Sequence, residues 1–174
     1  MKVFLFFFGS PLLSVITYRD GIMCSDARMS EDDVIWGVTP KIMRLSSGCL
    51  LGFTGDADAR FIVKLLDKVT TPKKIPLSSR LKSFDKIDSE VLLVFPNSEG
   101  WFIVAGKNGE AIPALTIGGF TATGSGAHFA LGALEQGATA IQAARIACKR
   151  VSSCGLPLHW LKLNSDDPIK TINH

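Results

Sequence analysis

The stretch from Ser14 to Asp26 constrains this chain most: Ser-Val-Ile-Thr-Tyr-Arg-Asp-Gly-Ile-Met-Cys-Ser-Asp. Two short β-prone runs flank an Asp-Gly pair at residues 20–21. Asp-Gly between such runs predicts a tight hairpin, because glycine accepts the positive φ that the turn requires. The hairpin would bring Ser14 back towards Asp26 and Arg28. A hydroxyl, a carboxylate and a guanidinium would then lie together, and we expect the chemistry of the chain there.

The composition is that of an ordinary globular domain. The 174 residues are 47% hydrophobic and 20% charged, and a single domain of this length buries about 70% of its extended-chain surface. The net charge is +3 without a basic run interleaved with aromatic residues, so no nucleic-acid partner is predicted. The four cysteines form no CxxC pair, and the three histidines lie far from metal-ligand spacing. These counts favour a reduced, cytoplasmic protein without a structural metal.

The first residues have a different character. Met1-Lys2 and the apolar residues 3–8 resemble the start of a signal peptide, but Gly9-Ser10-Pro11 interrupts the run and no small-x-small cleavage site follows. The run is also shorter than the ~20 residues of a membrane span. We therefore expect residues 1–13 to be a propeptide or an N-terminal extension, with no membrane partner.

The order of strands and helices predicts an α+β fold. Residues 29–33 read as a polar surface loop, and residues 164–174 as a polar C-terminal tail. Periodicity and turn signals predict strands at 35–39, 42–45, 49–53, 90–95, 101–105 and 158–163, an extended segment at 111–117, and helices at 56–69, 127–136 and 139–151. Asp56 or Thr54 can cap the first helix and Thr139 the last. Segregated strands and a helix pair favour a layered fold over a βαβ nucleotide-binding fold.

Four segments, taken in order, resemble a known family. Residues 14–28 resemble the opening of proteasome β-type subunits, in particular the bacterial protease HslV and its shorter phage and bacterial relatives. Thr39-Pro40-Lys41-Ile42 resembles the family's strand with a buried lysine. Residues 51–59 resemble the glycine-rich entry to its first helix, and Gly124-Ser125-Gly126 before two alanine-rich helices resembles its second half. The likeness covers residues 14–163.

The resemblance implies the N-terminal-nucleophile hydrolase fold, a four-layer αββα sandwich of two antiparallel sheets between helix layers. It implies a homo-oligomeric ring that works with an ATP-dependent unfoldase on a peptide or protein substrate. An apolar N-terminal run and the helix at 56–69 offer surfaces for such a ring. No cofactor is implied, although the likeness leaves room for a monovalent cation near the C-terminal loop.

The resemblance also assigns roles at the site. The nucleophile is the first residue of the mature chain, and its own α-amine is the base. The roles fall on Ser14 as nucleophile, Asp26 as buried carboxylate, Lys41 as the lysine, Gly55 as the oxyanion amide, and Ser125 with Gly126 beside the amino terminus. The chemistry is consistent with this assignment, because an α-amine with a reference pKa of about 8 is partly neutral near pH 7. A neighbouring lysine ammonium lowers that pKa further, and the carboxylate keeps the lysine charged.

The chain departs from the family pattern at several positions. Serine replaces threonine as nucleophile, and Leu13 precedes it. The Gly9–Ser10 junction offers a second candidate N-terminus, although the Tyr-Arg-Asp-Gly register favours Ser14. Val151 and Cys154 stand where the family often has an aspartate and a serine. Two alternatives remain, a non-catalytic ring subunit and an amidohydrolase of the same class acting on a small amide.

Each residue also has a plainer interpretation. Without the family likeness, Asp26 and Arg28 would be a surface pair and Lys41 a solvated lysine on a strand edge. Gly55 would belong to a helix cap, and Ser125 would serve a turn.

Overall fold

The chain folds as an α+β protein. The computed structural model describes residues 14–31, 34–55, 59–75, 89–105, 110–114 and 119–174. Its strands are β1 (Ile16–Arg19), β2 (Ile22–Asp26), β3 (Arg28–Glu31), β4 (Val34–Val38), β5 (Ile42–Arg44), β6 (Leu50–Gly55), β7 (Ser89–Val94), β8 (Gly100–Ala105), β9 (Glu110–Pro113), β10 (Phe120–Thr123), β11 (Leu158–Lys162) and β12 (Lys170–Ile172). Within these ranges the helices are α1 (Ala59–Leu66), α3 (Ala127–Glu135) and α4 (Ala140–Arg150), with a 3₁₀ turn, η1 (Pro72–Lys74).

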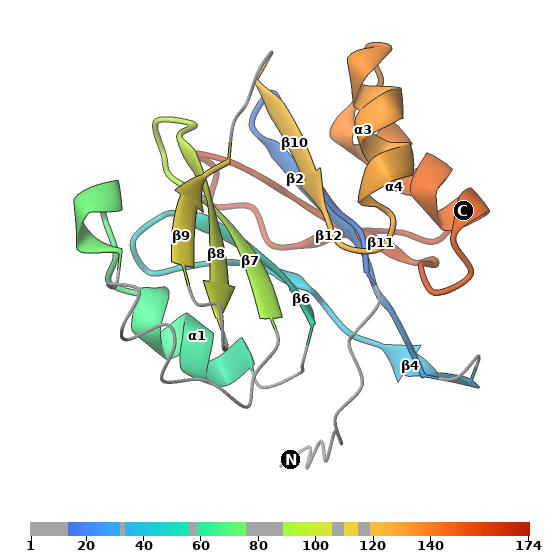
Figure 1. Ribbon diagram of the computed structural model, residues 1–174, viewed down its shortest axis with the longest axis horizontal. Helices are drawn as coiled ribbons and strands as arrows, with labels where there is room; N and C mark the ends of the chain where they lie inside the picture. The colour runs from blue at the N-terminus through green and yellow to red at the C-terminus, as the bar shows by residue number, and fades with distance from the viewer. Residues whose placement is uncertain (1–13, 32–33, 56–58, 76–88, 106–109, 115–118) are drawn as a thin grey trace.

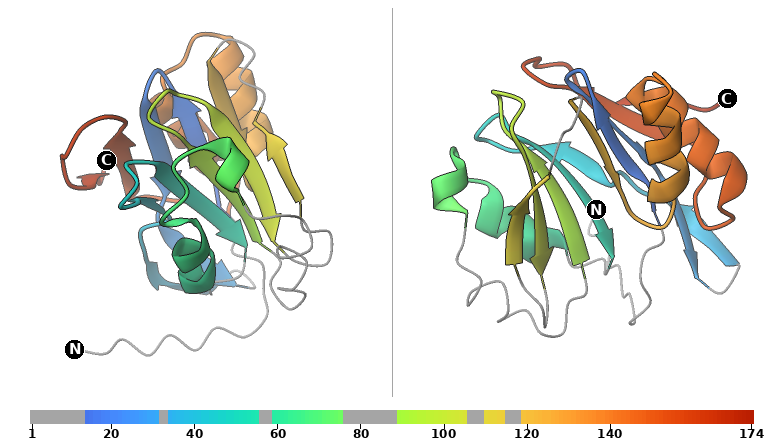
Figure 2. Two further views of the ribbon diagram at one scale, coloured as in Figure 1. Left: turned by 90° about the vertical axis from the view of Figure 1, so that its left-hand side faces the viewer. Right: turned by 45° about the horizontal axis from the view of Figure 1, so that its top comes forward.

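The strands form three antiparallel sheets. The first five-stranded sheet has the order β10-β1-β2-β11-β12, and the second has the order β5-β6-β7-β8-β9. Strands β3 and β4 form a separate pair. In Figure 1, α1 lies beside the second sheet, whereas α3 and α4 lie beside the first, and both views in Figure 2 keep these helices apart.

Three clusters of buried side chains hold these parts together. One joins α1 to the second sheet through residues such as Ile62, Leu66 and Leu93. Another joins α3 and α4 to the first sheet, with Ala143 and Ala147 of α4 close to Cys24. The third contains Ile16 and Met23 of the first sheet with Leu50 and Leu92 of the second. The inner faces of the two five-stranded sheets therefore pack on each other.

The first hairpin was predicted correctly. β1 and β2 pair with Ile16 opposite Ser25 and Arg19 opposite Ile22. Asp20 and Gly21 have φ values of 50° and 76°, the two positive angles of a type I′ turn. The turn chemistry therefore sets the register that carries Asp26 back alongside Val15, whose carbonyl accepts from the Asp26 amide at 3.2 Å.

Other local signals were confirmed as well. The hairpin of β7 and β8 is present. Helix α4 begins with a capping box in which the Thr139 side chain accepts from the Gln142 amide and Gln142 accepts from the Thr139 amide.

Two strand assignments were wrong. Residues 28–31 are strand β3, paired with β4, instead of the start of a surface loop. The C-terminal segment includes β12, which pairs with β11 at the edge of the first sheet. Both strands are short and have polar sequences without a clear strand periodicity. Pairing with the neighbouring strand, and not local sequence preference, therefore determines their conformation.

The first described helix also differs from its prediction. It ends at Leu66, and the hydroxyl of Thr54, one of the two proposed caps, donates to the Glu90 carbonyl within the second sheet. The other proposed cap, Asp56, lies outside the described residues, as do Ser10 and the rest of residues 1–13. Among the helices that the structure describes, none is long and apolar enough to cross a membrane.

Candidate active site

A buried ion pair lies at the centre of the site. Asp26 is the last residue of β2, and Lys41 directly precedes β5 of the other sheet. Lys41 Nζ lies 3.0 Å from both carboxylate oxygens, and both side chains are 0% exposed. The plainer interpretations of Asp26 as a surface residue and of Lys41 as a solvated lysine are therefore wrong.

The Asp26 carboxylate accepts four contacts from three hydrogen-bond donors. The Val15 amide donates to Oδ1 at 3.0 Å and the Gly155 amide to Oδ2 at 3.2 Å, in addition to the two contacts from Lys41. Burial raises the pKa of the Asp26 carboxyl, while Lys41 and the two backbone amides oppose that rise. Backbone N–H groups can only donate, so the geometry is that of an ionised carboxylate paired with an ammonium.

Ser14 lies next to this pair, just before β1. Its carbonyl oxygen accepts from the Gly126 amide and from the Ser125 hydroxyl, each at 3.2 Å. A Cβ added at Gly124, where φ is +92°, would collide with the same carbonyl oxygen. The glycine permits the close approach, and the segment 124–126 thereby fixes the Ser14 backbone. Ser14 is 0% exposed in the full-length chain, where its nitrogen is an amide bonded to Leu13.

Gly55 is the last residue of β6, and its neighbour Thr54 lies close to the segment that binds the Ser14 carbonyl. A Cβ at Gly124 would lie 3.1 Å from Thr54 Cγ2, so the end of β6 borders the loop that holds Ser14. Gly55 is buried with φ of +100°, a backbone conformation that favours glycine. Gly55 therefore lies at the end of the strand that borders this loop, and its role as the oxyanion amide stays a prediction.

Residues 152–155 form a loop whose role at the site was not predicted from the sequence. The Ser153 hydroxyl lies 3.3 Å from the Ser125 hydroxyl, and the Cys154 thiol lies 3.6 Å from it. Arg28 packs over Gly155 so closely that a Cβ there would collide with the guanidinium, and Arg28 Nη1 donates to the Ser152 carbonyl at 2.9 Å. Arg28 therefore holds the loop that donates to Asp26, instead of pairing with Asp26. In the sequence, the signal that could have pointed to this loop is Gly155, which closely follows Ser152 and Ser153.

The thiols beside the site are not activated. Burial raises the pKa of Cys24 and Cys154, and raises the pKa of Cys148 to about 12. A thiol with a raised pKa carries almost no thiolate near pH 7. Cys154 is therefore a neighbour of Ser125 and not a candidate nucleophile.

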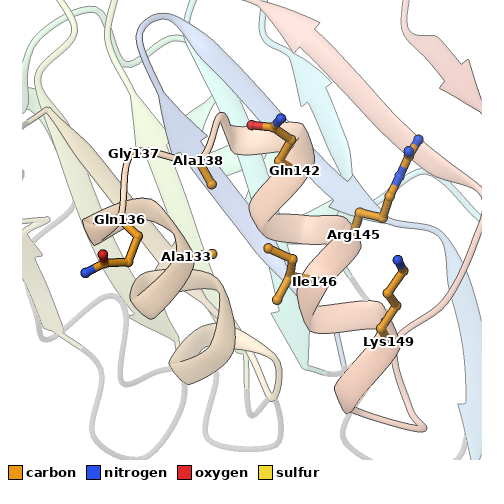
Figure 3. A pocket seen from close by; sticks show the side chains of 8 residues that line it. All are labelled: Ala133, Gln136, Gly137, Ala138, Gln142, Arg145, Ile146 and Lys149. Atoms are coloured by element: carbon orange, nitrogen blue, oxygen red, sulfur yellow. The ribbon is translucent and has the colours of Figure 1, made fainter.

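A separate open groove lies between α3 and α4. Its lining residues are Ala133, Gln136, Gly137, Ala138, Gln142, Arg145, Ile146 and Lys149 (Figure 3). None of the proposed site residues lines this groove. Among the described residues, no group of three or more His, Cys, Asp or Glu side chains is arranged to hold a metal ion.

The structure gathers the residues that the sequence singled out. Asp26 and Lys41 are in direct contact, Ser125 and Gly126 bind the carbonyl of Ser14, and Gly55 lies at the border. The missed contributors are the Val15 and Gly155 amides and Ser153. The sequence matches no protein-family model, and a search of curated proteins found no match.

Proposed function

We propose that this chain is a proteasome-like, HslV-like peptidase subunit whose nucleophile is Ser14 after removal of residues 1–13. The observation that carries the proposal is the fully buried Asp26–Lys41 pair beside the Ser14 backbone. An ion pair excluded from water is costly to build, and it is expected where a protein must fix the charge of a nearby group.

The proposed chemistry uses groups of this chain alone. Removal of residues 1–13 turns the Ser14 nitrogen into a free α-amine, which takes the hydroxyl proton as Ser14 Oγ attacks a substrate carbonyl. The Lys41 ammonium lowers the pKa of that amine, and Asp26 keeps Lys41 charged. A backbone amide at Gly55 stabilises the oxyanion, a contribution of about 3–4 kcal/mol in other hydrolases. The amine then protonates the leaving group, and water opens the ester.

The finer fold expectation belongs to this proposal. Two five-stranded sheets with helices packed on their outer faces are compatible with the four-layer αββα sandwich of N-terminal-nucleophile hydrolases. The proposal includes a peptide or protein substrate and an ATP-dependent unfoldase as partner, without a cofactor.

The proposal includes assembly into a homo-oligomeric ring. Helix α1 does not support it, because Ile62 and Leu66 are buried in the chain's own core. Strand β4 supports assembly, since its side chains Val34, Ile35 and Val38 are 53–60% exposed. Three large apolar side chains on one projecting strand pair are typical of an interface.

One set of observations favours a second candidate, a ring subunit that never frees its nucleophile. The family's aspartate and serine near the amino terminus are replaced by Val151 and by Cys154, whose thiol is not activated. Ser14 is also completely buried in the full-length chain.

Intact mass spectrometry combined with peptidase assays tests the proposal. We expect a mature species that starts at Ser14, cleaves casein or fluorogenic peptides, and is absent in Ser14→Ala. A species that starts at Ser10 would move the nucleophile to that residue. A permanently full-length, inactive chain would favour the second candidate, and turnover of small amides only would favour a small-amide hydrolase.

A further inference from the structure

The groove between α3 and α4 is the largest feature of the surface that the proposed active site does not use. Its volume is about 470 Å³, within the range of about 300–1,000 Å³ that binding sites for small molecules usually have. Those sites enclose most of their ligand, whereas this groove is open along the surface. It therefore suits a segment of chain that lies across the two helices.

Apolar side chains line part of this groove. Ile146 is 40% exposed, and Figure 3 shows its side chain on the side of α4 that faces Ala133 of α3. Phe129 is 47% exposed and lies one helical turn before Ala133, on the same side of α3. These three residues form an exposed apolar strip along the helix pair. Large apolar side chains gathered at one exposed place are typical of an interaction site.

The charged residues that line the groove are both cations. Arg145 and Lys149 lie along its α4 side (Figure 3). Nη2 of Arg145 donates to the carbonyl of His174, and this bond holds the guanidinium in place. Helix α4 contains no acidic residue, and Glu135, the only acid of α3, does not line the groove. The groove therefore combines an apolar strip with a positively charged edge.

We propose that this groove binds an acidic amphipathic helix of a partner protein. In this mode of recognition the apolar face of a helix lies in an apolar groove, so the partner's apolar side chains contact Ile146 and Phe129. Its carboxylates pair with Arg145 and Lys149, and such complementary charge fixes the orientation of the bound helix. The inference stands on the groove alone and does not depend on the proposed peptidase function.

The charges favour this occupant over two others. Nucleic acids are bound through many phosphate contacts, whereas this groove offers two cations beside an apolar strip. A symmetric contact between two copies places the same surface on both sides, so Arg145 and Lys149 of one copy would face the same cations of the other. Like charges set against each other disfavour an association, and an acidic partner avoids this cost.

A displayed library of helical peptides, selected on the full-length chain, tests the chemistry of the partner. We expect the enriched peptides to combine Leu or Phe with Asp or Glu at helical spacing, and to shift the NMR signals of the Ile146 methyl groups and of Arg145 Nε–H. Binding should weaken as salt is raised, because exposed charges are screened. Failure to enrich any peptide, equal binding of peptides with Glu replaced by Gln, or shifts confined to β4 would overturn the inference.

Matched variants locate the binding on this groove. We expect Lys149→Glu to weaken binding of the selected peptides about tenfold, because like charges then face each other, and peptides with lysine in place of their acids to regain it. Lys64→Glu, at an exposed position on α1, changes the net charge equally and should bind as wild type does. Ile146→Ser should also weaken binding about tenfold, because less apolar surface is buried. Ile112→Ser, at an exposed residue of β9, should not.

Three outcomes would overturn the proposal. Equal affinities of Lys149→Glu and Lys64→Glu for the peptides would place the binding elsewhere. A smaller assembly in Lys149→Glu and in Ile146→Ser, measured by light scattering, would assign the groove to a second copy of the chain. Binding of duplex DNA that is lost in Lys149→Glu would assign it to nucleic acid. None of these measurements requires peptidase activity, so a failure of the proposed function is distinguishable from a failure of this proposal.

Discussion

Lys41 Nζ lies 3.0 Å from both carboxylate oxygens of Asp26, although Asp26 ends a strand of one sheet and Lys41 directly precedes a strand of the other. The pair therefore links the two sheets beside Ser14. Its geometry exists only once both sheets are packed, so stability and the proposed activity depend on the same contact.

Replacing the lysine tests this dependence. We expect Lys41→Ala to abolish peptidase activity and to lower the free energy of unfolding by about 3–5 kcal/mol, because it leaves the buried Asp26 without its counter-ion. Lys64→Ala, at an exposed position on α1, is the control and should change neither quantity. Near-native activity in Lys41→Ala, measured with chemical denaturation in parallel, would remove Lys41 from the mechanism.

Gly124 offers a test of the Ser14 environment. In Gly124→Ala the new Cβ collides with the Ser14 carbonyl at a φ of +92°, and the left-handed backbone alone costs about 1–2 kcal/mol. We expect lower thermal stability and loss of activity. The matched variant Gly132→Ala, in α3 with no atom within 4 Å of the new Cβ, should stabilise the chain by up to about 1 kcal/mol. Similar melting temperatures for the two variants would contradict this account.

Processing at Ser14 should be slow. Self-cleavage requires the Ser14 hydroxyl to attack the Leu13 carbonyl, and leucine reaches the strained geometry less readily than glycine. Ser14 is also 0% exposed, which limits access of water to the ester. We expect a time course of intact mass to show persistent full-length chain, and Leu13→Gly to shorten it. Complete loss of residues 1–13 at the first time point would show that this expectation is wrong.

Assembly should depend on β4. Ile35→Lys places a charge on the exposed apolar strand, and we expect it to shift a ring towards the 18.8 kDa monomer in light scattering. Ile112→Lys, at a single exposed apolar residue on β9, serves as the control and should leave the assembly intact. A monomeric wild-type protein at micromolar concentration would exclude the ring.

Acid should destabilise the chain through His159. Burial holds the pKa of His159 below its ordinary value of 6.5, so the unfolded chain takes up the proton first. Between 6.5 and the folded pKa the unfolded state binds more protons, and stability falls as pH drops. Chemical denaturation on both sides of pH 6.5 should show this loss in wild type but a smaller one in His159→Asn. His128→Asn, at an exposed position on α3, should behave as wild type, and an equal slope in all three proteins would refute the assignment.

Some parts of the structure could be predicted from the sequence because local interactions determine them. The Asp20-Gly21 turn follows from two positive φ angles, and the start of α4 follows from the reciprocal bonds of Thr139 and Gln142. The family likeness added the candidate residues Ser14, Asp26, Lys41, Gly55, Ser125 and Gly126. None of these inferences required knowledge of a distant contact.

Only the tertiary structure decided which residues are buried and which distant segments pair. A lysine or aspartate carries no mark of burial in its own sequence, because its environment is created when the two sheets pack. The donation from Gly155 to Asp26, the clamp of Arg28 on residues 152–155, and the pairing of Ser25 with His159 all join segments more than 120 residues apart. Strand register across such distances is set by the packing of whole faces and not by local preference, and for that reason only the folded chain reveals these contacts.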